Sequence, residues 1–208
     1  MTIDADWQKA PWQQAEAASM DCVHGPEPAH KPVVQFKLAY DDSALYGIYQ
    51  VQDRFVRAVA ADLDGQVWKD SCVEFFFTPY AQPDTAYFNL EINCCGVFLF
   101  HHQMAPKQQV RCLKESDCRQ LCIAGSLPGP IQKEIEGPVQ WMLEFSIPYG
   151  ILEQYSVVER PAPGVNWRAN LHKCADDCSY PHWLTWSPIP GERPNFHQPQ
   201  YFGNLEFI

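Results

Sequence analysis

Two tryptophans stand beside polar positions of strand-like segments in this sequence. Trp68 comes shortly before Glu74 and its aromatic strand, and Trp186 lies in a second apolar segment, Leu184 to Ile189. An indole ring packs well against the C–H face of a sugar ring, whose hydroxyls then require polar partners. We therefore predict that Trp68 and Trp186 form the two walls of a sugar-binding site.

Polar side chains suited to the floor of such a site alternate with apolar residues along three predicted strands. They are Glu74 on the first strand, Asn89, Glu91 and Asn93 on the second, and Arg168, Asn170 and His172 on the third. A carboxylate accepts hydrogen bonds from two adjacent hydroxyls, an amide both donates and accepts, and an arginine donates in a fixed fork. The predicted sugar-binding residues are Trp68, Glu74, Asn89, Arg168, Asn170 and Trp186, with Glu91 and His197 as further candidates.

The same residue types also suit a structural role or a catalytic one. Polar residues on one face of a sheet often form cross-strand pairs, and tryptophans in loops often close the end of a core. Glu74 and Glu91 are also suited to the acid and base roles of a glycosidase, which needs a carboxylate separation of about 5 Å or about 6.5–9.5 Å. The sequence leaves both of these roles open.

The elements that carry these residues are predicted to be short strands. Eighteen prolines and eleven glycines interrupt runs of aromatic and β-branched residues, and only Trp12 to Met20 has a helical period. Apolar residues alternate at 34–40, 73–77, 88–92 and 141–147, further strands are expected at 45–51, 165–172, 183–186 and 203–208, and 103–138 is interpreted as an insertion partly in strands. We predict an all-β fold, a two-sheet antiparallel β-sandwich of jelly-roll or immunoglobulin-like type with minor helical turns, in a single domain over 1–208.

The charge balance excludes several classes of partner. The chain has 15 basic and 25 acidic residues, so its formal net charge is −10. This charge opposes binding to nucleic acid and to anionic membranes. No apolar run approaches the roughly 20 residues of a membrane span, and the first residues lack the features of a signal peptide. We expect a cytoplasmic protein; the alternative is a secreted or periplasmic one whose signal peptide has been removed.

The cysteines are interpreted as reduced thiols. Their number, nine, is odd, and disulfide frameworks of secreted proteins rarely leave one cysteine over. Neither Cys118 with Cys122 nor Cys174 with Cys178 has the paired spacing typical of a zinc site.

Several of these segments together resemble the carbohydrate-binding modules of family nine. They are Asp4 to Trp7 with Trp12, Leu38 to Asp42, Leu45-Tyr46, Trp68 to Glu74, Phe88 to Asn93, Trp186-Ser187 and Pro199 to Leu205, in the family's order and over nearly the whole chain. Trp167 to Asn170 and Phe196 to Pro199 are closer to a bacterial subgroup of candidate sugar-binding proteins.

The resemblance implies a non-catalytic β-sandwich, related to DOMON domains, that clamps the end of a sugar chain between Trp68 and Trp186. Glu74 matches the family's hydroxyl-binding carboxylate, and Asn170 matches a polar amide. Such modules occur beside xylanases and other glycoside hydrolases of xylan and cellulose breakdown, so the implied partners are a mono- or oligosaccharide and a glycoside hydrolase. Calcium is the implied structural ion, for which loop carboxylates are available at Asp4, Asp6, Asp41, Asp42, Asp62, Asp64, Asp176 and Asp177.

The chain departs from the family's pattern at two points. Asn89 stands where the family has a sugar-binding arginine, a role that Arg168 is expected to take over, and one extra residue separates Asp70 from Val73. Related sandwiches also bind haem or other proteins, with His101, His102 or Met104 as axial candidates for haem iron. A glycoside-processing enzyme and such a haem- or protein-binding sandwich are the alternatives to sugar binding.

Overall fold

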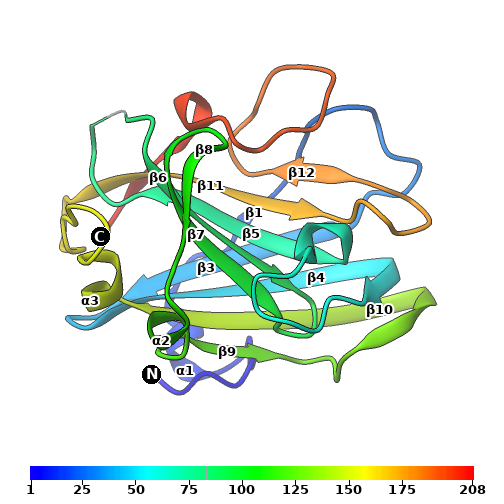
Figure 1. The fold of residues 1–208 in the computed structure, drawn as a ribbon. Coiled ribbons are helices and arrows are strands. Elements are labelled where there is room, and N and C mark those ends of the chain that lie inside the picture. The colour runs from blue at the N-terminus through cyan, green and yellow to red at the C-terminus, as the bar shows by residue number, and fades with distance from the viewer. Residues whose placement is uncertain (83) are drawn as a thin grey trace.

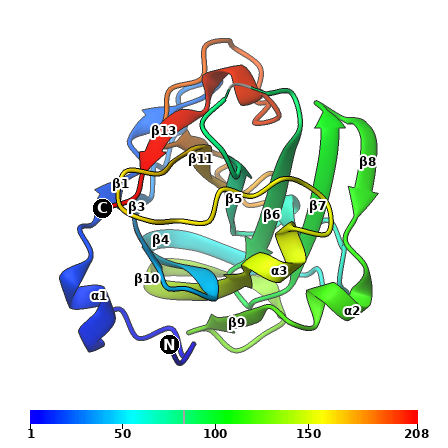
Figure 2. The same ribbon diagram turned by 90° about the vertical axis from the view of Figure 1, so that its left-hand side faces the viewer.

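The alternating apolar segments form strands that pair in two antiparallel sheets in a computed structural model of the protein (Figure 1). The structure describes residues 1–82 and 84–208, and in this part of the chain the smaller sheet has five strands and the larger one eight. The smaller sheet has the order β1-β3-β4-β10-β9; the larger has the order β2-β12-β11-β5-β6-β7-β8, and β13 also pairs with β11. The predicted all-β sandwich is therefore confirmed. Figure 2 shows the two sheets from their ends.

The helices and strands are, in chain order, α1 (Ala10–Gln14), β1 (Ala18–Ser19), β2 (Cys22–Val23), β3 (Val33–Tyr40), β4 (Ala44–Ala58), η1 (Val67–Lys69), β5 (Cys72–Thr78), β6 (Tyr87–Asn93), β7 (Phe98–Ala105), β8 (Gln108–Cys112), α2 (Glu115–Cys118), β9 (Cys122–Gly125), β10 (Ile131–Pro148), α3 (Tyr149–Leu152), β11 (Asn166–Cys174), β12 (Trp183–Thr185), η2 (Pro199–Tyr201) and β13 (Gly203–Glu206). None of the helices in the described ranges is both long and apolar enough to cross a membrane.

The predicted strands are present, and two of them are longer than expected. β4 continues to Ala58 and β10 begins at Ile131, because these two strands pair along most of their length through polar segments that lack alternation. Part of the expected insertion at 103–138 belongs to β7, β8, β9 and β10. Only the first residues of the segment from Trp12 to Met20, which has a helical period, are helical, because α1 ends at Gln14.

The core lies between the two sheets and is largely aromatic. Phe75 and Phe77 of β5 stack on each other, and the ring of Phe75 lies 6.1 Å from that of Phe145 on β10 in the opposite sheet. Trp167 of β11 stacks on Phe77 with its ring centroid 5.5 Å away. The apolar residues predicted to share one face of their strands therefore do so.

The outer face of the larger sheet is also largely buried along β5, β6 and β11. The segment 186–202, here called the covering loop, passes over it, and a second apolar cluster forms beneath, which includes Phe76 and Tyr87 from the sheet and Phe196 and Phe202 from the loop. The polar residues that alternate with the core residues are enclosed there: the exposed fraction is 3% for Glu74 and 4% for Glu91. One face of the larger sheet is therefore apolar and packs against the smaller sheet. The other face carries both polar and apolar residues, which the covering loop encloses.

The turn between β3 and β4 is stabilised by one carboxylate. Asp41 accepts hydrogen bonds from the backbone of Ser43 and Ala44 and from the hydroxyl of Tyr46. Burial alone would raise the pKa of Asp41, but the hydrogen bonds from Ser43 and Tyr46 outweigh it and lower the pKa to about 2. The charged form therefore stabilises this hairpin.

We predict that Asp41→Asn lowers the melting temperature at neutral pH. A lowered pKa means that the carboxylate contributes stability above its unfolded pKa of about 4, and that this contribution is lost as the pH falls toward 2. The difference in melting temperature between wild type and variant should therefore shrink between pH 4 and pH 2, as followed by circular dichroism. A difference that is constant over this range would contradict the assignment.

Candidate functional site

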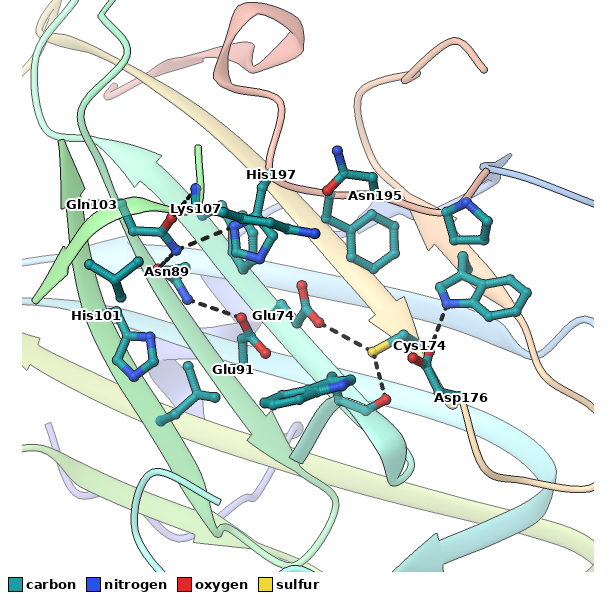
Figure 3. A pocket seen from close by; sticks show the side chains of 17 residues that line it. Glu74, Asn89, Glu91, His101, Gln103, Lys107, Cys174, Asp176, Asn195 and His197 are labelled. Carbon is teal, nitrogen blue, oxygen red and sulfur yellow. Dashed lines mark hydrogen bonds between the residues drawn. The ribbon is translucent and has the colours of Figure 1, made fainter. Parts of the chain in front are cut away.

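A pocket of about 460 Å³ opens on the outer face of the larger sheet (Figure 3). Its floor comes from β5, β6, β7 and β11, and its sides come from η1, β8, β12 and the covering loop. Its volume lies within the range of roughly 300–1,000 Å³ that is usual for small-molecule sites. Five of the eight predicted site residues line it, namely Trp68, Glu74, Asn89, Glu91 and His197.

Glu74 and Glu91 form the acidic centre of this pocket. They are directly opposite each other in the β5–β6 register, and His172 of β11 is opposite Glu74 on the other side. Nδ1 of His172 lies 3.2 Å from Oε2 of Glu74, and Sγ of Cys174 lies 3.2 Å from Oε1. Two like charges opposite each other on neighbouring strands repel, so this arrangement favours at least one protonated carboxyl group.

Burial raises the pKa of both carboxyl groups. The pKa of Glu74 is well above its ordinary value because of desolvation, with Cys174 and Glu91 as further causes. Burial also raises the pKa of Glu91 to about 7, against the effect of a 3.0 Å hydrogen bond from the amide of Asn89. His172 is the reverse case, since burial lowers its pKa and keeps its ring neutral.

A chain of amides continues from Glu91 to the edge of the pocket. The amide of Gln103 donates to Oδ1 of Asn89 over 2.9 Å, and its own oxygen accepts from the backbone N–H of Lys107. Nδ1 of His197 lies 2.7 Å from the hydroxyl of Tyr87 and 3.3 Å from Nε2 of Gln103. Burial lowers the pKa of His197 to about 4, with Lys107 as the second cause, so its ring is neutral at pH 7.

Trp186, predicted as the second wall, does not line the pocket. It packs against the core between the sheets, with its ring 6.0 Å from that of Phe36 on β3. A Cβ atom at Gly203 would lie 2.8 Å from its ring, so the indole is held against the backbone of β13. The reason is the strand period of two, which directs Leu184 and Trp186 to the core and Trp183 to the outer face.

Trp183 therefore stands in the pocket together with Trp68. Asp176 connects the two tryptophans, because its backbone N–H donates to the carbonyl of Trp68 over 3.3 Å and its carboxylate accepts from the indole N–H of Trp183 over 2.7 Å. Both indoles are only partly buried. The pocket thus has two tryptophan side chains, of which one, Trp68, was predicted from the sequence.

Arg168 and Asn170 also lie outside the pocket. The amide of Asn170 donates to the carbonyl of Ser187 and accepts from its N–H, each over 2.9 Å. The guanidinium of Arg168 donates to the carbonyl of Phe202. Both side chains are on the predicted outer face, but at the part of β11 where the covering loop is attached, so they hold that loop.

Further polar residues of the pocket were not predicted from the sequence as site residues. They are His101, Gln103 and Lys107 on and after β7, Cys174 and Asp176 at the end of β11, and Asn195 in the covering loop. The alternation of His101 and Gln103 on one strand is a signal that could have identified these two. Oδ1 of Asn195 is buried and has no hydrogen-bond partner among the described residues, so a ligand group or water could bond to it.

No group of three side-chain carboxylates comes together among the described residues. Among residues 1–82 and 84–208, two groups of at least three metal-binding side chains come together, and each contains a cysteine. Several of the loop carboxylates proposed for calcium are already used: Asp41 caps its turn, and Asp177 is near Arg57 and Lys69. Calcium remains a prediction from the resemblance.

The haem candidates are not arranged around a common point. His101 lines the pocket, whereas its neighbour His102 packs on Phe88 of the core, with 4.7 Å between the ring centroids. Met104 has 51% of its surface exposed. His101 and His102 face opposite sides of β7 and cannot both bind one iron.

Comparison with known proteins relates nearly the whole chain to one family. The family model described as "Carbohydrate-binding family 9" matches residues 6–207. A candidate carbohydrate-binding protein from Bacteroides uniformis is 35% identical, with a TM-score of 0.85 over 94% of this chain and 88% of that one. Among curated proteins, none matches.

Two further solved structures share the fold at lower identity. A family 9 carbohydrate-binding module from Caldicellulosiruptor kristjanssonii in complex with cellotriose is 16% identical, with a TM-score of 0.62 over 100% of this chain and 89% of that one. A module of the same family and organism in complex with glucose is 15% identical, with a TM-score of 0.62 over 100% and 91% of the two chains.

We predict that Glu91→Gln flattens the pH dependence of stability near neutrality. A carboxyl group whose folded pKa is raised from 4.5 to about 7 contributes stability below pH 4.5 and loses it as the pH rises through 7. A shift of this size corresponds to a change in the free energy of unfolding on the order of 3 kcal/mol between low and high pH. The glutamine keeps an acceptor for Asn89, so urea unfolding at pH 5 and pH 8 should differ less in the variant than in wild type. An unchanged difference would show that Glu91 is not the group that titrates.

We also predict that Asn170→Ala destabilises the protein by roughly 1–3 kcal/mol, because it removes a buried side chain that bonds both the N–H and the carbonyl of the partly buried Ser187. Urea unfolding would measure the loss. Asn204→Ala, which removes a hydrogen bond between exposed side chains, is the matched control and should cost much less. Equal losses would mean that Asn170 does not hold the covering loop.

Proposed function

The chain belongs to carbohydrate-binding family 9, and on that premise we propose that it binds a mono- or oligosaccharide, through a chain end, in the pocket of the larger sheet without cleaving it. The observation that carries this proposal is the combination of two indoles, Trp68 and Trp183, with two buried carboxyl groups, Glu74 and Glu91, in one cavity of about 460 Å³.

The indoles supply the apolar contacts in this proposal. Trp68 and Trp183 are partly exposed to the cavity. The carboxylate of Asp176 holds the indole of Trp183, and its backbone N–H bonds the backbone carbonyl of Trp68. Side chains that are held before the ligand arrives lose little conformational entropy on binding. A sugar ring between them would bury its C–H faces against apolar surface.

The polar floor supplies the contacts to the hydroxyls. Glu74 and Glu91 would accept from adjacent hydroxyls, while Asn89, Gln103 and Lys107 extend the row toward the β7–β8 turn. Asn195 offers an oxygen from the covering loop that has no partner within the described part of the chain. This row takes the role that was predicted from the sequence for Arg168 and Asn170.

The charge of the site favours a neutral sugar. Two carboxyl groups lie at its centre and Asp176 lies beside them, while Lys107 is the one lysine or arginine that the described residues contribute to the lining. An anionic sugar acid would bring a further negative charge toward these groups. We therefore expect neutral sugars such as glucose and cellobiose to bind better than glucuronic acid.

The surroundings of Glu74 support binding rather than hydrolysis. Each of its oxygens already has a protein neighbour, His172 or Cys174. These contacts leave Glu74 less free to exchange protons with a substrate. A glycoside hydrolase as partner and a cytoplasmic location stay predictions.

The affinity should be modest. Ring stacking and a few hydrogen bonds must offset the desolvation of the hydroxyls, which suggests dissociation constants from about micromolar to about millimolar, or about −8 to −4 kcal/mol.

We predict that Trp183→Ala weakens binding of cellobiose or glucose by at least about tenfold, because the substitution removes one wall of the pocket. Isothermal titration calorimetry with the intact chain would measure the loss. Trp186→Phe is the matched control: it keeps a ring in the core three residues away and should change sugar affinity little, at some cost in stability.

Two results would contradict this prediction. Normal sugar binding by Trp183→Ala would show that this residue is not part of the site. Loss of binding in a folded Trp186→Phe protein would show that Trp186, and not Trp183, contacts the sugar. Chromatography of the sugars after the titration should recover them intact, since cleavage would favour the enzyme alternative.

A further inference from the structure

Three side chains of metal-binding type meet beside the proposed sugar pocket. Asp64 lies in the segment between β4 and η1, His101 on β7, and Cys112 on β8. One ligand atom of each lies within 4.8 Å of the others. Nε2 of His101 contacts Oδ1 of Asp64, and Sγ of Cys112 lies 3.3 Å from Oδ2.

The backbone holds these three residues in place. His101 and Cys112 are register partners in the antiparallel β7–β8 pair, so their side chains are neighbours on one face. The N–H of Asp64 donates to the carbonyl of Phe98, at the start of β7, over 3.0 Å. Asp64 also has a φ of 67°, a left-handed conformation that aspartate tolerates better than most residues. The cluster therefore does not depend on a freely moving loop.

The three donors suit one class of metal. A nitrogen, a thiolate sulfur and a carboxylate oxygen are ligands of Zn²⁺ and similar divalent transition metals, whereas calcium prefers oxygens alone. Zinc bonds of about 2.0–2.3 Å in a tetrahedral site place ligand atoms roughly 3–4 Å apart. The separation of 3.3 Å between Cys112 and Asp64 is already in that range.

An ion can reach the cluster from outside. Asp64 and Cys112 line a second cavity of about 380 Å³, which also contains Asp62 and Glu115. These additional carboxylates would attract cations to the entrance. Asp64 and Cys112 are exposed and His101 is half-buried, so no core residue has to move.

We propose that Asp64, His101 and Cys112 bind a divalent transition metal of the Zn²⁺ type, with a fourth position that water occupies. The site would connect the β7–β8 hairpin to the segment that leads into η1 and Trp68, and both of these elements line the sugar pocket. The proposal does not depend on sugar binding.

Metal binding at this site would release a proton. Burial and the neighbouring carboxylate of Asp64 raise the pKa of the Cys112 thiol, so without metal the sulfur is protonated at pH 7. Formation of the metal–sulfur bond expels this proton, and no electron transfer is involved.

The test is a titration of the reduced, chelator-treated intact chain with Co²⁺, which reports on its ligands by absorption. We expect a thiolate-to-cobalt band and visible d–d bands that saturate at one equivalent and disappear when Zn²⁺ displaces Co²⁺. Cys112→Ser and Asp64→Asn should lose the thiolate band or weaken Co²⁺ binding at least tenfold.

Two control variants separate this site from other thiols. Cys122→Ser removes an exposed thiol on β9, and Cys174→Ser disrupts the buried group of Cys72, Glu74 and Cys174. Both should keep the cobalt bands. Absence of the bands in wild type would overturn the proposal and leave only a hydrogen-bonded cluster. Their loss in either control variant, or their persistence in Cys112→Ser, would also overturn it.

Folding of the variants can be checked independently of the metal. Without metal, Cys112→Ser should melt close to wild type, since the exposed thiol contributes one hydrogen bond to Asp64. Zn²⁺ should then raise the melting temperature of wild type and leave that of Cys112→Ser unchanged. An equal rise in both proteins would show that zinc stabilises the chain elsewhere.

Discussion

Successive side chains along each strand of the larger sheet point to opposite faces, and this alternation places some residues in the core and others in the pocket. On β5 and β11, Phe75 and Leu171 face the smaller sheet, while Glu74 and His172 face the covering loop. Because both faces are buried, the polar residues on the outer side must find partners within the protein. The pocket forms where the covering loop leaves part of this polar face open.

The burial of this polar face explains both its electrostatics and its architecture. Carboxyl groups removed from water are easier to protonate, so the pKa values of Glu74 and Glu91 are raised. The covering loop is held by side chains of the same face, with Asn170 bonding Ser187 and His24 bonding the backbone of Ile189 and Asn195. One row of polar residues thus supports the loop at one end and would meet a ligand at the other.

Local patterns in the sequence predicted the strands and the polar face, but not how that face is divided. The period of two correctly placed Glu74, Asn89 and Glu91 together, because alternation is a local property. Trp186 was assigned to the pocket because of the residues around it. It is two positions after Leu184, a core residue, so alternation along the strand would have placed it in the core and Trp183 on the outer face. Whether Asn170 meets ligand or loop depends on contacts with residues 17 positions away, which no local pattern records.

The central claim is that a sugar lies between Trp68 and Trp183 above Glu74 and Glu91. The most direct test is a crystal structure of the intact protein with cellobiose at a saturating concentration. We expect a sugar ring between these two indoles, with a hydroxyl within hydrogen-bonding distance of at least one of the two carboxyl groups. A sugar bound beside Trp186 or Arg168, or an empty pocket under these conditions, would contradict the account.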